Sequence, residues 1–268
     1  MPAIETATGP ISYEITDLTP RWREPQETIL FHHGVGTDMD IWIDWLPMLA
    51  TDFRCVRLDM RGCGRSVVPP AGHDWTMDGM MADLLAVADA VDAERFHLIG
   101  ESIGGTISLY TALHAGDRLH SVTALSTGHR GNYINHVGGW REIVERDGFA
   151  AWTERMMEHR FYPGAVDEDV YDWFASTQAN SDPAATLALG ELLMGQDLSG
   201  DLGKIDCPVL LIHPDSSPFL PVTMSAEIHS LLPNSEMMVI PHAKHAIACS
   251  HATEAALAFM DFVSERVA

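Results

Sequence analysis

The sequence of 268 residues has no apolar run near the ~20 residues that a membrane-spanning helix requires. Residues 1–14 lack the basic segment and the apolar stretch of a secretory signal, so we do not expect one. The four cysteines are scattered and form no C-x-x-C pair. Cysteine usage of this kind is typical of reduced thiols and predicts a cytoplasmic protein.

Basic side chains are scarce: 16 lysines and arginines stand against 38 acidic residues, giving a net charge of −22. A field of this sign repels phosphate backbones and anionic lipid surfaces. We therefore expect no nucleic-acid or membrane partner. The expected partner is a small-molecule substrate, and a homodimer stays open.

Hydrophobic residues make up 46% of the chain, enough for a substantial core. Short apolar runs separated by helical patterns indicate a parallel sheet that is covered on both faces. The run around residues 11–15 alternates and predicts an antiparallel edge. The other expected strands lie at residues 28–31, 53–58, 96–99, 121–125, 209–212 and 237–240.

The alternation stops between residues 128 and 199, where the sequence is helical and rich in large apolar groups. We predict an α/β core formed by residues 1–127 and 200–268, interrupted by a helical cap at residues 128–199. An insertion at the carboxyl edge of a parallel sheet commonly covers the ligand crevice. Two apolar helix faces are expected in it, one with Trp140, Ile143 and Val144 and one with Phe149, Trp152 and Met156.

The strongest local motif is Gly100-Glu101-Ser102-Ile103-Gly104, between an expected strand and an expected helix. In this G-x-S-x-G pattern a sharp, strained turn presents the serine, so the residues two before and two after it must be small. The hydroxyl then stands at a helix N-terminus, which favours developing negative charge. The motif predicts that Ser102 is a nucleophile, although a capping serine with flanking glycines is the structural alternative.

A serine hydroxyl needs a base to remove its proton. The expected base is His245, just past the last predicted strand, and His242 is its close competitor. A zinc site on these two histidines has no nearby acidic or cysteine partner, so we expect no metal and no cofactor. His97 and His213 lie within predicted strands and are expected to be core or crevice-lining groups.

These features together resemble the α/β-hydrolase fold superfamily from Thr28 to nearly the end of the chain. The resemblance implies a mostly parallel eight-stranded sheet with helices on both faces and a helical cap before the penultimate strand. Residues 36–66 and 197–209 are similar to the β-ketoadipate enol-lactonase group. The superfamily landmarks are His33-Gly34, residues 59–66, residues 100–104 and His245.

Carried over by position, the resemblance implies Ser102 as nucleophile and His245 as base, with the backbone amides of Val35 and Ile103 as the oxyanion hole. The family usually has Gly-x-x-Asp after the penultimate strand, but here Ser217 stands where the aspartate is expected. Asp215 is the only carboxylate in that loop, so we predict that it orients His245. The alternative is a solvated Asp215 and an incomplete triad.

Large apolar residues of the insertion and the loop near Phe219 are expected to line a substrate pocket. In so acidic a protein an anionic substrate needs a local cation, and Arg130 is the candidate carboxylate-binding residue. The expected substrate-binding residues are His129, Arg130, Trp140, Trp152, Met156 and Phe219.

The sequence favours a serine hydrolase that cleaves a small carboxylic ester or lactone through an acyl-enzyme on Ser102. A C–C bond hydrolase of a β-diketone is a near variant. A non-hydrolytic member of the fold, such as a small-molecule receptor or a cofactor-free oxygenase or lyase, is the rival class. Ser217 in the acid position is the one feature that favours the rival.

Overall fold

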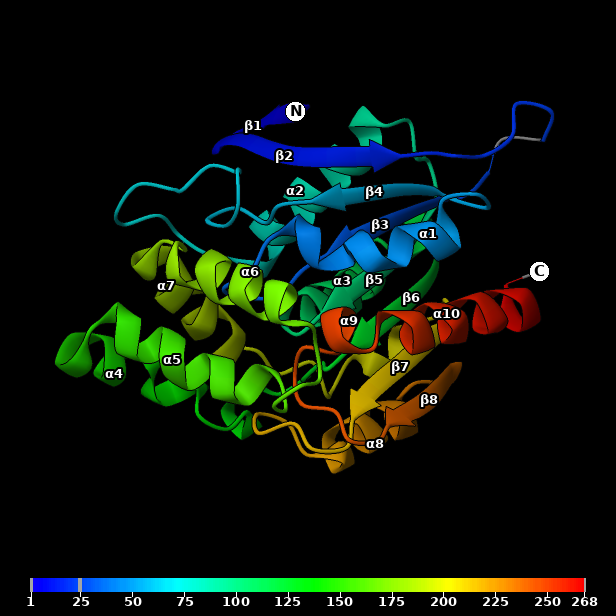
Figure 1. The fold of residues 1–268 in the computed structure, drawn as a ribbon. Coiled ribbons are helices and arrows are strands. Elements are labelled where there is room, and N and C mark those ends of the chain that lie inside the picture. The colour runs from blue at the N-terminus through cyan, green and yellow to red at the C-terminus, as the bar shows by residue number, and fades with distance from the viewer. Residues whose placement is uncertain (1, 24–25, 268) are drawn as a thin grey trace.

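The computed structural model describes residues 2–23 and 26–267 and contains one eight-stranded sheet (Figure 1). The strand order is β1-β2-β4-β3-β5-β6-β7-β8. β2 runs antiparallel to both of its neighbours, β1 and β4, and all other neighbouring strands are parallel. The predicted mostly parallel, eight-stranded architecture is confirmed. The strands are β1 (Ala3–Thr6), β2 (Gly9–Thr16), β3 (Thr28–His32), β4 (Arg54–Leu58), β5 (Phe96–Glu101), β6 (Leu119–Leu125), β7 (Val209–Pro214) and β8 (Ser235–Ile240).

The central strands are buried on both faces, which explains their nearly unbroken apolar runs. Successive side chains point to opposite faces. Ile29 and Phe31 of β3 therefore join one core cluster, whereas Leu30 joins the other. The first cluster includes α10 through Phe259, and the second includes α2 through Leu84.

Helices cover both faces of the sheet (Figure 1). On one side the core cluster is completed by α1 (Leu46–Leu49), α9 (Ile247–Ser250) and α10 (Ala252–Arg266). On the other side the second core cluster is completed by α2 (Met77–Ala90), α3 (Ile103–His114) and α8 (Val222–Leu231).

Four α-helices lie between β6 and β7, and we refer to them as the cap helices. They are α4 (Trp140–Asp147), α5 (Phe149–Arg160), α6 (Glu168–Ala179) and α7 (Pro183–Met194). Gly148, at φ 89°, separates α4 from α5 because a left-handed residue cannot continue a helix. Asp182 begins α7 by accepting a hydrogen bond from the amide of Ala185, with Pro183 at the first helical position.

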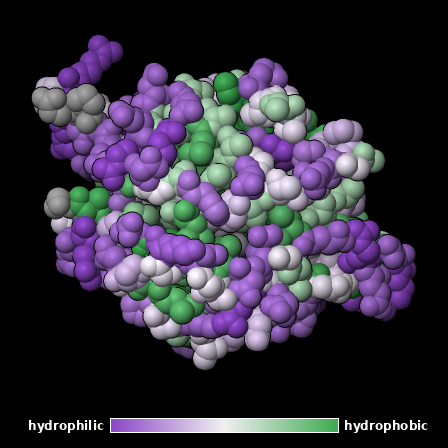
Figure 2. All heavy atoms as spheres, turned by 180° about the vertical axis from the view of Figure 1, so that it is seen from behind, coloured by the Kyte–Doolittle hydropathy of each residue, from purple (hydrophilic) through white to green (hydrophobic). Residues whose placement is uncertain are grey.

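No helix in the described part of the chain is long and apolar enough to cross a bilayer. Figure 2 shows one face of the molecule, which is largely hydrophilic with small apolar areas between the polar side chains. This agrees with the large negative net charge.

Candidate active site

The turn between β5 and α3 holds Ser102 in a strained backbone conformation, with φ 59° and ψ −123°. Non-glycine residues rarely adopt a positive φ, and such strain is typical of functional turns. Ser102 immediately precedes the first residue of α3, so its hydroxyl lies at the helix N-terminus. The strand–turn–helix context that the motif requires is therefore present.

The glycines of the motif have no room for a side chain. A Cβ atom on Gly104 would lie closer than 3.0 Å to the carbonyl oxygens of His32 and His33, a distance that real Cβ atoms essentially never show. A Cβ on Gly100 would collide in the same way with the backbone of Gly104. The turn thus packs directly against β3 and the loop that follows it.

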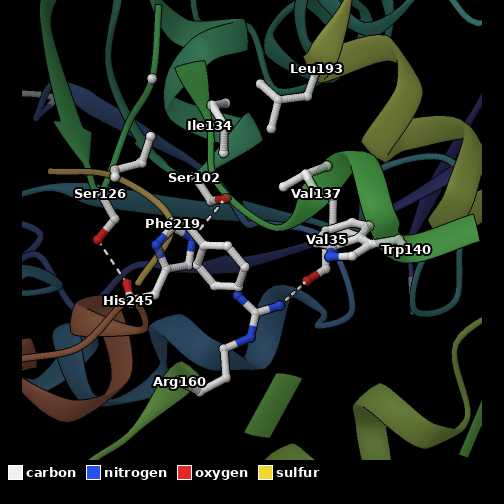
Figure 3. A pocket seen from close by; sticks show the side chains of 12 residues that line it. Val35, Ser102, Ser126, Ile134, Val137, Trp140, Arg160, Leu193, Phe219 and His245 are labelled. Carbon is white, nitrogen blue, oxygen red and sulfur yellow. Dashed lines mark hydrogen bonds between the residues drawn. The ribbon is translucent and has the colours of Figure 1, made fainter. Parts of the chain in front are cut away.

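His245 lies in the loop after β8 and is almost fully buried. Its Nε2 atom is 3.0 Å from Oγ of Ser102, within hydrogen-bonding distance (Figure 3). Ser126, the residue after β6, donates a hydrogen bond of 2.7 Å to the carbonyl oxygen of His245. The ring of Phe219 packs edge-on against the imidazole at 4.7 Å. The structure thus brings together the two residues expected to be nucleophile and base.

The position beside Nδ1 of His245, where an acid was expected, is occupied by Ser217, whose Oγ lies 3.3 Å from Nδ1. The same Oγ accepts a hydrogen bond from the amide of Leu220. A hydroxyl oxygen has two lone pairs, so it can accept both the amide hydrogen and a hydrogen on Nδ1. With Nδ1 protonated, Nε2 is free to accept from Ser102.

Asp215 does not contact His245, contrary to the prediction from sequence. Its amide still pairs with the carbonyl of Ile240 beside β8, and its two carboxylate oxygens accept from the amides of His242 and Ala243. The amide hydrogen bond from His242, with the hydroxyl of Ser216, lowers the pKa of Asp215. Asp215 therefore holds the loop that leads to His245.

His245 lies in a buried environment with a cation, Arg160, nearby. Burial is the main cause that lowers the pKa of His245 well below its usual value of 6.5. The charge of Arg160, and that of His213 and His159 when they are protonated, lowers it further. No carboxylate of the described residues opposes this effect. The imidazole is thus held neutral, as a general base must be, but its protonated form is poorly stabilised.

The expected oxyanion-hole residues lie around Ser102. Gly34 packs so closely that a Cβ there would be 3.1 Å from Cβ of Ser102. Val35 lines the same pocket as Ser102 and His245, and Ile103 is the first residue of α3, where amides lack intrahelical acceptors. His33 fixes the loop, because its Nε2 accepts from the amide of Met60 and its Nδ1 bonds to the carbonyl of Gly34.

The C-terminal end of α5 contacts both halves of the site. Arg160 donates a 2.7 Å hydrogen bond from Nη2 to the carbonyl oxygen of Val35. The amides of His245 and Ala246 donate to the carbonyl oxygens of His159 and Arg160, at 3.4 and 3.3 Å. The end of this cap helix thus touches the expected oxyanion loop and the base.

Arg160 was not predicted from the sequence, although a signal was available. Trp152, Met156 and Arg160 are spaced four residues apart, so the arginine continues the apolar face of α5. A charged residue in such a stripe indicates a buried charge. Burial lowers the pKa of Arg160 to about 10, against the opposing charge of Glu101.

Glu101, the residue before the nucleophile, is also buried. Its Oε1 accepts a 2.8 Å hydrogen bond from the amide of Ala248 at the start of α9. Burial raises its pKa to about 7, while the amide of Ala248 and the charge of Arg160 oppose the rise. This carboxyl group therefore anchors the chain just beyond His245.

The pocket above Ser102 is narrow and mostly apolar. Its cavity volume is about 20 Å³, little more than one water molecule, so a substrate must displace lining side chains. Trp140 and Phe219 line it as predicted, whereas Trp152 and Met156 are not among the lining residues and pack in the cap core. The lining residues are Val35, Ser102, Ser126, Gly128, Ile134, Val137, Trp140, Arg160, Leu193, Phe219, Leu220 and His245 (Figure 3).

His129 and Arg130 also lie outside this pocket, contrary to prediction. The guanidinium of Arg130 forms an ion pair with Glu227 of α8 and lies over the ring of Tyr133. His129 is buried with its Nε2 3.6 Å from the same glutamate. The charge of Arg130 is thus already balanced away from Ser102.

The remaining histidines singled out in the sequence have structural partners. His97 bonds to Ser121 and Glu27, and His213 bonds to Leu220 and Ser225. In residues 2–23 and 26–267 no group of three or more His, Cys, Asp or Glu side chains is arranged to hold a metal ion.

Known proteins of one family and one fold are similar to this chain. A family model described as the alpha/beta hydrolase fold matches residues 27–252. A protein of Agrobacterium fabrum named "Putative carbamate hydrolase RutD" is 28% identical over 232 residues, covering 82% of this chain and 86% of its own.

Two solved structures share the fold over almost the whole chain. The enol-lactonase from Burkholderia xenovorans LB400 is 20% identical, with a TM-score of 0.88, and covers 98% of this chain and 100% of its own. A malate-bound thermophilic esterase from Thermogutta terrifontis is 21% identical, with a TM-score of 0.85, and covers 98% of this chain and 97% of its own. At this identity they establish the fold.

Proposed function

The chain belongs to the α/β-hydrolase fold family, and from that premise we propose that it is a serine hydrolase that cleaves small carboxylic esters or lactones. The observation that carries the proposal is the 3.0 Å contact between Oγ of Ser102, on its strained turn, and Nε2 of His245. A nucleophile within hydrogen-bonding distance of its base is the signature of covalent catalysis.

In the first half of the reaction, Oγ of Ser102 attacks the scissile carbonyl carbon and passes its proton to Nε2 of His245. The carbonyl oxygen becomes an oxyanion, which the amides of Val35 and Ile103 stabilise by roughly 3 kcal/mol each. His245 then gives the proton to the departing alkoxide oxygen as the C–O bond breaks. The products are an alcohol, or the opened end of a lactone, and an acyl-enzyme on Ser102.

In the second half, His245 removes a proton from water, and the resulting hydroxide attacks the acyl-enzyme. The second oxyanion occupies the same site. When it collapses, the ester bond to Ser102 breaks and His245 returns the proton to Oγ. The carboxylic acid leaves, and the enzyme is restored without a cofactor.

Ser217 is the positioning residue for the base in this scheme. By accepting the hydrogen on Nδ1, it selects the tautomer in which Nε2 faces Ser102. A hydroxyl fixes orientation but supplies no negative charge. We therefore expect a slower enzyme than one with a carboxylate at this position, since an acid in a triad also stabilises the imidazolium.

The apolar pocket walls and the fold neighbours support an ester or lactone substrate. A carbamate is a further substrate to include, because a relative carries that name and the same apparatus attacks a carbamoyl carbon. The three substrate types differ in the leaving group, so one panel compares them directly.

The test is covalent labelling with a fluorophosphonate, followed by turnover of short esters, lactones and carbamates. We expect labelling of the wild type and none of Ser102→Ala, with a fall in kcat of at least about 1,000-fold. Ser230→Ala, at an exposed serine of α8, is the matched control and should behave as the wild type.

A non-hydrolytic function is the second candidate, and Ser217 opposite His245 is the observation that favours it. A receptor built on this scaffold needs no charge stabilisation of the base. If the folded protein showed no labelling and no turnover, the hydrolase proposal would be rejected in favour of this one.

A further inference from the structure

Arg160 is a buried cation with no ion-pair partner within 4.0 Å among the described residues. It makes two hydrogen bonds to uncharged groups, from Nη2 to the carbonyl of Val35 and from Nε to Oε1 of Gln178, and its guanidinium lies over the ring of Phe174. Glu101 acts on it only at longer range. A buried charge without a close counter-ion is costly, and a ligand of opposite charge in the pocket would reduce that cost.

The guanidinium has an unused donor at the pocket. Arg160 lines the same cavity as Ser102 and His245, and in Figure 3 it extends toward the space between Val35 and Phe219. A guanidinium has five N–H donors. Nη1 has no acceptor in residues 2–23 and 26–267.

The other lining residues provide no second charge near Ser102. Apart from Arg160 and His245, the pocket is formed by apolar side chains, glycine and two serines. Arg130, which composition alone favoured as the local cation, is held by Glu227. An anion that enters this pocket therefore has one fixed cation available.

We propose that Arg160 binds a carboxylate on the substrate, so that the preferred substrates are short esters or lactones that carry a free carboxylate a few bonds from the scissile carbonyl. This inference rests on the proposed hydrolase function and names its substrate class. Guanidinium–carboxylate pairs are short and directional, so the pair would also orient the acyl chain over Ser102.

A bound carboxylate has a second effect on the site. The charge of Arg160 disfavours protonation of His245, and Ser217 supplies no compensating charge. A substrate carboxylate on Arg160 neutralises that charge and makes the imidazolium easier to form during acylation. The substrate would thus provide part of the electrostatic help that an acid at position 217 would give.

The experiment compares two methyl esters of nearly the same shape. Monomethyl glutarate ends in a carboxylate, whereas methyl 5-oxohexanoate ends in a neutral methyl ketone. We expect wild-type kcat/KM to favour the carboxylate by about 100-fold, because a buried charge pair contributes strongly to recognition. In Arg160→Met the ratio should fall to about one. Arg160→Lys should retain part of it, because the charge remains.

Arg155→Met is the matched control, since Arg155 lies on the same helix but is exposed and pairs with Asp147. It should keep the wild-type preference. Each variant is checked for folding by circular dichroism and thermal unfolding, and Arg160→Lys replaces Arg160→Met in the comparison if the methionine variant does not fold. A wild type without the preference, or an Arg160 variant that keeps it in full, overturns the proposal.

Direct binding separates this inference from the hydrolase proposal. Calorimetry with glutarate should show binding to Ser102→Ala and at least about tenfold weaker binding to the Ser102→Ala, Arg160→Met double variant. Turnover of the neutral ester without a carboxylate preference rejects only the substrate class. Glutarate binding without turnover of either ester or labelling of Ser102 rejects only the hydrolase function.

The electrostatic effect has its own readout. If the carboxylate also assists His245, the advantage of monomethyl glutarate appears in kcat as well as in KM. An advantage confined to KM supports recognition by Arg160 and rejects the assistance to the base.

Discussion

The turn that carries Ser102 and the loop after β7 both place a hydroxyl beside His245, but they meet different requirements. At the turn, Gly100 and Gly104 have no space for a Cβ, so a steric condition limits the residue type to glycine. In the loop, Ser217 meets a hydrogen-bonding condition that an aspartate also satisfies. A steric condition admits one residue, whereas an orienting hydrogen bond admits several. Substitutions on the two sides should therefore have very different effects.

The largest effect is expected for Gly104→Ala. Its Cβ would press on backbone oxygens of His32 and His33, which cannot move without displacing β3. We expect a loss of about 3 kcal/mol in the free energy of unfolding and a fall in kcat/KM of at least about 100-fold. Denaturant unfolding and ester kinetics measure both. Gly116→Ala is the control, because a Cβ there meets nothing within 4 Å. Equal behaviour of the two variants would contradict the steric account.

The second effect is a gain. In Ser217→Asp a carboxylate would face Nδ1 of His245 and stabilise the imidazolium. We expect kcat/KM for a neutral ester to rise about tenfold, a modest share of what a triad aspartate contributes in other enzymes. Ser230→Asp adds the same charge at an exposed site and should change little. A folded Ser217→Asp enzyme with unchanged or lower kcat/KM would show that His245 does not lack an acid.

The third effect is a shift in pH dependence. Burial and the charges of Arg160, His213 and His159 lower the pKa of His245, so kcat/KM for a neutral ester should stay high below pH 6.5 and fall only in more acidic solution. Arg160→Met removes a cation that disfavours the imidazolium. The acidic limb should therefore move to higher pH. Rate measurements from about pH 4 to 8 test this, and a limb that stays in place would exclude Arg160 as a cause.

The smallest effect is expected for Asp215→Asn. The asparagine oxygen still accepts one of the two amide hydrogen bonds from His242 and Ala243, and no contact with His245 is lost. We expect kcat/KM to change by less than about threefold. Steady-state kinetics of Asp215→Asn measure this change. A 100-fold loss of kcat/KM would show that Asp215 is the acid of the triad, as expected from the sequence.

Local features of the sequence predicted the sheet and two site residues. The motif around Ser102 is a run of five residues between a strand and a helix, and His245 follows the last strand, so both are visible in a linear pattern. The prediction that Asp215 orients His245 was wrong. Asp215 still pairs with Ile240 of β8, and its carboxylate accepts from an amide of the loop that follows. Ser217, two residues further on, is the one that reaches the imidazole.

The two arginines show why the pocket was harder to predict. Arg130 follows β6 in the chain, but its partner Glu227 comes from α8, far along the chain. Arg160 lies in the cap, and its surroundings come from Val35, Glu101 and Gln178 in three separate segments. Which charge is neutralised depends on contacts between distant segments, which no local pattern contains.

The end of α5 has a mechanical consequence. It bonds to the carbonyl of Val35 on one side and to the amides of His245 and Ala246 on the other. The cavity above Ser102 holds little more than one water, so admitting a substrate requires a displacement of its walls, to which α5 contributes Arg160. A movement of this helix end would therefore displace the loop of Val35 and His245 together. Under the proposed mechanism, substrate access and the alignment of Ser102 with His245 would then be coupled, because the same helix end borders the pocket and bonds to both segments.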